Sequence, residues 1–169
     1  MFKLLVVEDD RELNKTVCVY LSQNGYDVVG CLSANEAYDV MYSGTLVDLI
    51  ISDIMMPEVD GFEFAKTIRE LDAEIPILFM TARDDFASKQ RGFRAGVDDY
   101  MVKPVDLDEL LLRVEALLRR AKIAHSRRIE LGSLVLDADE HTAYVAGEEV
   151  QLTVREFNII YKLLSYPKK

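Results

Sequence analysis

Five polar side chains follow short apolar runs of this 169-residue sequence, and their types suit metal and phosphate chemistry. Asp53 comes directly after the run 46–52, and the turn-forming residues Pro57 and Gly61 follow it closely. An apolar, partly β-branched run of strand length that is stopped by proline and glycine is typical of a buried strand. The sequence therefore predicts that Asp53 stands at the carboxyl end of a buried strand, where its carboxylate is available for chemistry.

Two more acids, Glu8 and Asp9, follow an earlier apolar run. Three carboxylates that converge on one crevice repel one another and require a compensating cation. Mg²⁺ is the expected ion because it prefers carboxylate, carbonyl and water oxygens. The predicted ligands are Asp9, Asp53, Glu8 through a water molecule, and the backbone carbonyl of Met55. Acids after strands also cap helices, and we assign that structural role to Asp10.

Thr81 and Lys103 end two further apolar runs. A lysine at a strand end supplies a point charge for a phosphate, and a threonine hydroxyl can donate a hydrogen bond to a phosphate oxygen. Each residue alone is commonly just solvated. An acid pair, a single Asp, a Thr and a Lys on successive strand ends form a more specific combination, which favours phosphate chemistry.

Apolar runs alternate with amphipathic stretches throughout the first 121 residues. The expected strands are 3–7, 26–30, 47–52, 75–80 and 99–102, and the expected helices are 11–23, 34–42, 62–71, 86–95 and 107–120. This alternation predicts an α/β fold, a flavodoxin-like (βα)5 parallel sheet in the order 2-1-3-4-5 with helices on both faces. Ligands bind such a sheet at the carboxyl ends of strands 1 and 3, where Glu8, Asp9 and Asp53 fall.

Charge, cysteine spacing and hydropathy exclude several classes of function. Residues 1–121 contain 13 Lys/Arg and 23 Asp/Glu, whereas residues 122–169 contain seven of each. The acidic first segment is a poor nucleic-acid binder, because phosphate contacts need clustered cations. Cys18 and Cys31 show neither metal-ligand nor disulfide spacing. No run approaches the roughly 20 apolar residues of a membrane span, so we expect a cytoplasmic protein without membrane contact.

The motifs around these side chains resemble the receiver domain of two-component response regulators, in order and spacing, over residues 1–121. They are Val-Val-Glu-Asp-Asp at 6–10, Ser-Asp-Ile-Met-Met-Pro at 52–57 with Asp-Gly at 60–61, Met-Thr-Ala at 80–82, and Asp-Asp-Tyr at 98–100 with Lys-Pro at 103–104. The resemblance implies that a sensor histidine kinase phosphorylates Asp53. It also implies a Mg²⁺ ion held by Glu8, Asp9 and Asp53, and a phosphoryl group engaged by Thr81 and Lys103.

Three further properties follow from the same resemblance. A cis peptide bond is expected between Lys103 and Pro104, since only X-Pro bonds make cis inexpensive. The protein is not expected to be an enzyme beyond its own phosphorylation from a donor and its own dephosphorylation. Partner choice is expected on the helix at 11–23, including Asn14, Lys15, Cys18 and Val19.

The resemblance also implies a switch and a homodimer. On phosphorylation, Thr81 would move toward the phosphate and the ring of Tyr100 would turn inward; the alternative is that Tyr100 is an ordinary half-buried strand aromatic. Similarity to winged-helix response regulators implies a phosphorylation-promoted dimer through the fourth helix, the fifth strand and the last receiver helix. The expected intersubunit pairs are Lys89 with Glu109, Asp99 with Arg113, and Asp98 with Arg120.

Residues 122–128 form the expected linker, and residues 129–169 the expected N-terminal fragment of an effector domain. Short apolar runs separated by Gly132 and Gly147 predict a small antiparallel sheet. Thr153 and Glu156 have the spacing of a capping box at the start of one helix. This segment resembles the beginning of an OmpR/PhoB-type winged-helix domain but ends before a recognition helix. We therefore expect the intact parent protein, and not this truncated chain, to bind DNA.

Two other functions remain open at this point. Magnesium-dependent phosphohydrolases also place an Asp nucleophile on a strand end of an α/β sheet. Met55 stands where that class typically has a second acid, which argues against it, and continuous turnover of a phosphate ester would argue for it. A receiver without an output domain would act as a phosphate sink or a partner-binding module. The sheet and helix expected after residue 128 argue against that reading for the parent protein.

Overall fold

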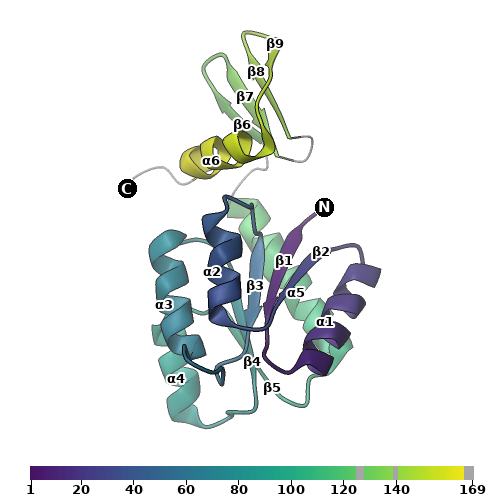
Figure 1. The fold of residues 1–169 in the computed structure, drawn as a ribbon, viewed down its shortest axis with the longest axis vertical. Helices are drawn as coiled ribbons and strands as arrows, with labels where there is room; N and C mark the ends of the chain where they lie inside the picture. The colour runs from purple at the N-terminus through teal and green to yellow at the C-terminus, as the bar shows by residue number, and fades with distance from the viewer. Residues whose placement is uncertain (125–127, 139–140, 166–169) are drawn as a thin grey trace.

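The structure is a computed structural model that describes residues 1–124, 128–138 and 141–165 (Figure 1). The first unit is a parallel sheet in the order β2-β1-β3-β4-β5, which confirms the predicted flavodoxin-like topology. Its strands are β1 (Lys3–Val7), β2 (Asp27–Cys31), β3 (Leu49–Ser52), β4 (Ile77–Thr81) and β5 (Asp99–Val102). Its helices are α1 (Arg11–Gln23), α2 (Ala34–Tyr42), α3 (Gly61–Leu71), α4 (Phe86–Arg94) and α5 (Leu107–Ala124).

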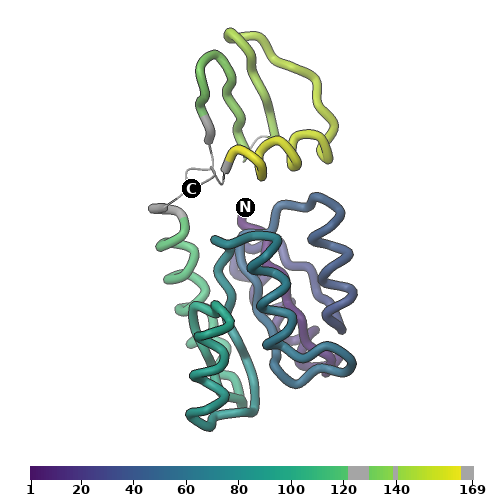
Figure 2. The backbone as a smooth tube through the Cα atoms, turned by 90° about the vertical axis from the view of Figure 1, so that its left-hand side faces the viewer, coloured from purple at the N-terminus to yellow at the C-terminus, as the bar shows by residue number. Residues whose placement is uncertain are grey.

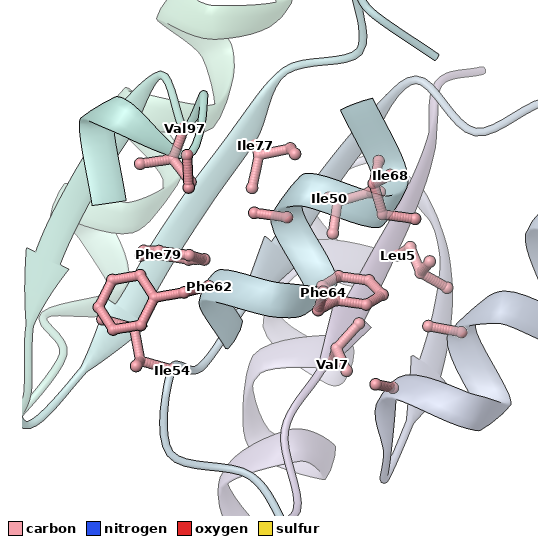
Figure 3. Packing of buried hydrophobic residues seen from close by; sticks show 14 of the residues in the cluster. Leu5, Val7, Ile50, Ile54, Phe62, Phe64, Ile68, Ile77, Phe79 and Val97 are labelled. Atoms are coloured by element: carbon pink, nitrogen blue, oxygen red, sulfur yellow. The ribbon is translucent and has the colours of Figure 1, made fainter. Parts of the chain in front are cut away.

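Apolar side chains cover both faces of this sheet because successive strand residues point to opposite sides. One face packs against α2, α3 and α4, where Leu5, Ile50 and Phe79 meet Phe62 and Phe64 (Figure 3). The other face packs against α1 and α5 through a second set of alternating strand residues and helix residues: Leu4, Val6, Leu49, Ile51, Leu78, Met80, Val17, Leu21, Leu110 and Val114. A sheet buried on both faces needs such continuous apolar strands, and it holds the strand ends rigidly.

Aspartates cap the N-terminal ends of four of the helices that follow the strands, and Asp106 is the cap of α5. The Oδ1 atom of Asp10 accepts hydrogen bonds from the N–H groups of Glu12 and Leu13 at 3.1 Å, which confirms its predicted role as the cap of α1. Asp60 and Asp85 cap α3 and α4 in the same way. A side-chain oxygen at this position satisfies N–H groups that have no partner within the helix.

The second unit is an antiparallel sheet in the order β6-β7-β8-β9, followed by one helix, as predicted (Figure 2). Its elements are β6 (Arg128–Leu131), β7 (Leu134–Asp137), β8 (Thr142–Val145), β9 (Glu148–Val150) and α6 (Val154–Ser165). Thr153 and Glu156 exchange hydrogen bonds at 2.9 and 3.1 Å and form the predicted capping box. Leu136 and Phe157 lie in the small core, and Leu46 of the first unit packs against it.

The segment between the two units differs slightly from the predicted linker. Helix α5 continues to Ala124 and so includes the first three residues of the predicted linker, and β6 begins at Arg128. The remaining linker residues, 125–127, lie outside the described residues, as do residues 139–140 and 166–169. Within the described parts of the chain, none of the helices has the length and apolar character needed to cross a membrane.

Candidate functional site

The register of the sheet brings the predicted acids together. Val7 and Ser52 are paired at the ends of β1 and β3, and the N–H of Asp53 donates to the carbonyl of Val7 at 3.0 Å. Glu8 and Asp53 therefore leave adjacent strands side by side. One carboxylate oxygen from each of Glu8, Asp9 and Asp53 lies within 4.8 Å of the others. This grouping was predicted from the strand ends alone.

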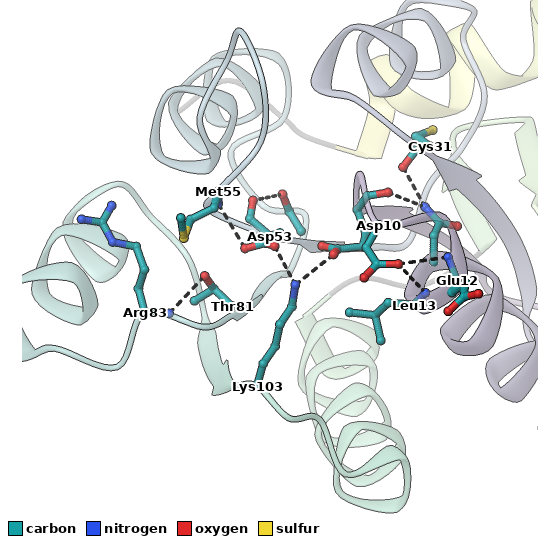
Figure 4. Close-up of polar contacts among 12 residues, drawn as sticks. Asp10, Glu12, Leu13, Cys31, Asp53, Met55, Thr81, Arg83 and Lys103 are labelled. Carbon is teal, nitrogen blue, oxygen red and sulfur yellow. Dashed lines mark hydrogen bonds and ion pairs between the residues drawn. The ribbon is translucent and has the colours of Figure 1, made fainter.

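Lys103 reaches across from the end of β5 to both buried acids (Figure 4). Its Nζ atom lies 2.7 Å from Oδ2 of Asp53 and 2.9 Å from Oε1 of Glu8. The side chains of Glu8 and Asp53 are only 1% and 6% exposed, so water screens these contacts little. The peptide bond between Lys103 and Pro104 is cis, as predicted.

The surroundings shift the pKa values of Glu8 and Asp53 in opposite directions. Burial raises the pKa of Glu8 to about 7, against the lowering effect of Lys103, and the neighbouring Asp53 adds to the rise. Burial also acts to raise the pKa of Asp53, but hydrogen bonds, first among them the one from Lys103, lower it below its ordinary value. Burial opposes the charge of Lys103, yet the two acids raise its pKa. Asp53 is thus the ionised member of the pair.

The acids have more carboxylate oxygens than Lys103 can bind. The Oε2 atom of Glu8 is buried and has no hydrogen-bond partner, although buried polar atoms are normally paired. An unpaired buried oxygen within a group of three acids fits an oxygen-seeking divalent cation. The N–H of Met55 donates to Oδ1 of Asp53 at 3.1 Å, which places Met55 beside the acids. The role of its carbonyl as a metal ligand stays a prediction.

Gly61, at the start of α3, allows the chain after Asp53 to turn tightly. A Cβ atom on Gly61 would lie 2.5 Å from the carbonyl oxygen of Asp53 and 2.6 Å from the Cα of Ile54. Both of these are backbone atoms, so no side-chain rotation could relieve the collision. The glycine that predicted the end of the strand therefore also allows α3 to start close against the backbone of Asp53.

Thr81 and Tyr100 are linked through the backbone of Arg83, a residue that sequence analysis missed. Thr81 is fully buried, and its Oγ1 accepts from the N–H of Arg83 at 3.4 Å. The hydroxyl of Tyr100 donates to the carbonyl of Arg83. The Tyr100 ring is buried, packs edge-on against Phe79, and has Nζ of Lys89 6.0 Å from its centre. Backbone contacts of this kind carry no sequence signature.

The residues predicted for a dimer form contacts within one chain. Arg113 holds Asp99 through two hydrogen bonds of 2.8 and 3.0 Å and Glu109 through bonds of 2.9 and 3.1 Å. Asp98 accepts instead from Nη2 of Arg69 at 2.8 Å, a partner that sequence analysis missed. Arg120 is exposed on α5. The intersubunit pairs stay predictions, because a single chain does not test them.

One expectation for partner choice is wrong. Asn14 is 6% exposed, because its amide turns inward toward the ends of β1 and β2, so it cannot belong to a partner surface. Lys15 and Val19 of the same helix are exposed, and Cys18 is half-buried. The helical spacing alone did not distinguish Asn14 from its solvent-facing neighbours.

The geometry of these strand ends agrees with comparisons to known proteins. The family model of the response regulator receiver domain matches residues 4–115. The chain belongs to this family. The matched range includes Glu8, Asp9, Asp53, Thr81 and Lys103.

The similarity to known proteins continues past the receiver residues into the second unit. The heme response regulator HssR of Staphylococcus epidermidis is 35% identical over 99% of this chain and 74% of its own length. The response regulator MprA of Mycobacterium bovis is 36% identical with the same coverage. The structure of DrrB, a Thermotoga maritima OmpR/PhoB homologue, superimposes on this structure with a TM-score of 0.64 at 31% sequence identity. The match covers 98% of this chain and 73% of the DrrB chain. The receiver is thus homologous to OmpR/PhoB response regulators of two-component systems.

Proposed function

We propose that Asp53 is the phosphoacceptor and that a sensor histidine kinase supplies the phosphoryl group. The observation that carries this proposal is the hydrogen bond of 2.7 Å between Lys103 and a buried, ionised Asp53. A carboxylate oxygen of Asp53 attacks the phosphorus atom, the bond from phosphorus to the donor nitrogen breaks, and an acyl phosphate forms. The lowered pKa of Asp53 keeps the attacking oxygen unprotonated.

Charge neutralisation is the main contribution of the surrounding residues. Phosphoryl transfer depends on positioning and on cations near the transferring oxygens. Lys103 supplies one such cation from the protein itself. Glu8, Asp9 and Asp53 would hold Mg²⁺, which would supply further positive charge to the phosphoryl oxygens. We propose that the Thr81 hydroxyl donates a hydrogen bond to a phosphoryl oxygen of the product.

The chemistry can be tested by measuring how much acyl phosphate forms on the protein. The chain is incubated with acetyl phosphate, and acyl phosphate on the protein is measured with Mg²⁺ and with a chelator in its place. We expect one phosphoryl group per chain with Mg²⁺ and almost none with the chelator. Continuous hydrolysis of a phosphate ester such as p-nitrophenyl phosphate, with no phosphoprotein, would instead favour a phosphohydrolase.

We further propose that Thr81 and Tyr100 report the state of Asp53. An added phosphoryl group carries close to two negative charges and attracts the hydroxyl of Thr81. Thr81 and Tyr100 both bond to the backbone of Arg83, so a movement of one alters the contacts of the other. Nuclear magnetic resonance of Tyr100 with and without phosphoryl donor tests this: an unchanged ring environment would exclude it from the switch.

The face made by α4, β5 and α5 is the proposed surface for a homodimer. The proposed intersubunit pairs are Lys89 with Glu109, Asp99 with Arg113, and Asp98 with Arg120. Exposed ion pairs contribute only about 0 to 1 kcal/mol each, which suits an interface that can be switched. Phe86 and Phe93 of α4 are 77% and 51% exposed and line a shallow hollow together with Lys89, and they would add apolar area to a dimer. Light scattering at micromolar concentration with and without phosphoryl donor tests the assembly; an unchanged monomer mass would refute it.

DNA binding is proposed for a protein that carries a complete output domain. Helix-turn-helix recognition needs a second helix in the major groove. After α5, the described residues contain one helix, α6, so we assign them no DNA reading. For kinase choice we propose the accessible members of the predicted set on α1, which are the exposed Lys15 and Val19 and the half-buried Cys18.

A further inference from the structure

Asn14 is a buried polar side chain that the proposed phosphoryl chemistry does not use. Its Nδ2 atom donates to the backbone carbonyl of Glu8 at 3.0 Å and to that of Cys31 at 2.8 Å. Its Oδ1 atom accepts from the thiol of Cys18 at 3.3 Å. Two carbonyl acceptors require the NH₂ end of the amide, so the partners define its orientation. The amide therefore joins α1 to the ends of β1 and β2.

These contacts close the turn that carries two of the acids. Glu8 lies one residue past β1, and its N–H donates to the carbonyl of Cys31 at 3.0 Å while its own carbonyl is held by Asn14. The backbone N–H of Asn14 donates to the carbonyl of Asp10 at 2.8 Å. Asn14 thus fixes both ends of the turn from Glu8 to Asp10, and Asp9 lies between them.

Gly30 on β2 leaves the space that Asn14 occupies. A Cβ atom at position 30 would lie 2.5 Å from Oδ1 of Asn14 and 3.1 Å from Sγ of Cys18. The first distance is well below an ordinary van der Waals contact, so any side chain at this position must push the amide away from its carbonyl partners. The two residues are consequently a matched pair, and each offers an independent way to disturb the same contacts.

We propose that Asn14 is a positioning residue for the Mg²⁺ site, holding Glu8 and Asp9 toward Asp53 before the ion binds. The inference rests on the metal site proposed above. Three acids within 4.8 Å repel one another, and the single charge of Lys103 offsets only part of this repulsion, so a turn free to relax would move them apart. Removing groups that orient metal ligands typically weakens metal binding by about 10- to 100-fold. We expect the lower value, because Asn14 holds the backbone of the ligands.

Calorimetric titration with Mg²⁺ tests the proposal on the whole 169-residue chain. Asn14→Ala and Gly30→Ala should each raise the dissociation constant about 10-fold. The double variant should be no weaker than Asn14→Ala, because the alanine at position 30 then has no amide to displace. Asn24→Ala is the matched control: its amide donates to the carbonyl of Tyr20 at the exposed end of α1, and Mg²⁺ affinity should not change.

Hydrogen exchange of the Glu8 amide in the metal-free protein gives a second readout. Exchange should be faster in Asn14→Ala and Gly30→Ala than in the wild type, because the Glu8 turn is no longer held. Unchanged Mg²⁺ affinity in folded variants, or fully additive losses in the double variant, would overturn the positioning role. Should Asn14→Ala fail to fold, Gly30→Ala decides alone. Absence of saturable Mg²⁺ binding in the wild type would instead overturn the metal site itself, and the positioning role with it.

Discussion

Replacing Lys103 with Met should destabilise the metal-free protein in a manner that depends on pH. The substitution keeps most of the side-chain volume but removes the cation that lies 2.7 Å from Asp53 and 2.9 Å from Glu8. Removing one member of a buried ion pair typically costs about 3–5 kcal/mol, because a buried charge is left uncompensated. Lys103 is 21% exposed and Glu8 can take up a proton, so we expect about 3 kcal/mol near pH 8.

The sign of the pH dependence follows from Glu8. Its pKa in the folded protein, about 7, lies above its ordinary value of 4.5, so the folded state binds the extra proton. Stability from such a group is present below the ordinary pKa and is lost as pH rises through the folded pKa. Without Lys103 the folded pKa rises further, and the loss continues to higher pH. Because one pKa unit corresponds to about 1.4 kcal/mol, the destabilisation should be about 1–2 kcal/mol smaller near pH 6 than near pH 8.

Urea unfolding of the wild type, Lys103→Met and Lys66→Met at both pH values measures this effect. Lys66 is exposed on α3 and serves as the control, for which we expect a change below about 0.5 kcal/mol. Millimolar Mg²⁺ should restore part of the stability of Lys103→Met, because the ion replaces the lost positive charge. A loss that is equal at both pH values and insensitive to Mg²⁺ would refute the reasoning about the buried acids.

Three further outcomes are expected. Gly61→Ala should lower the free energy of unfolding by about 1–3 kcal/mol and slow phosphorylation, because the new Cβ collides with the backbone of Asp53. Urea unfolding measures the stability, and acyl phosphate formation measures the rate. Unchanged stability and rate would contradict this prediction. Mg²⁺ should bind more weakly as pH falls below about 7, since Glu8 takes up a proton in that range. Calorimetric titration at several pH values should show this weakening. A Mg²⁺ affinity that does not change with pH would exclude Glu8 from the metal site. Arg113→Ala should weaken phosphorylation-dependent dimers with little effect on monomer stability, as sedimentation would reveal, whereas intact dimers would remove Arg113 from the interface.

The sequence was sufficient to predict the strand ends, because their signal is local. Apolar runs of strand length and the acids directly after them give the order of elements, and the parallel topology then brings Glu8 and Asp53 to one edge. The caps Asp10 and Thr153 were predictable for the same reason, since a cap lies within three residues of the N–H groups that it binds.

Contacts that join distant elements were not predictable from the pattern. Asn14 shares a helix with exposed polar residues, and only the three-dimensional packing shows that its amide binds the carbonyls of Glu8 and Cys31. Arg69 likewise holds Asp98 from 29 positions away. The role of Arg83 uses its backbone, which is common to all residues. Such contacts depend on how helices are rotated against the sheet, and a single sequence does not reveal that rotation.

The most direct test of the central claim is the intact mass of the protein after incubation with acetyl phosphate and Mg²⁺. The wild type and Asp60→Asn, a control at the cap of α3, should each gain one phosphoryl group. Asp53→Asn should gain none, because an amide cannot replace the nucleophilic carboxylate. A phosphoryl group that appears undiminished on Asp53→Asn would contradict the account.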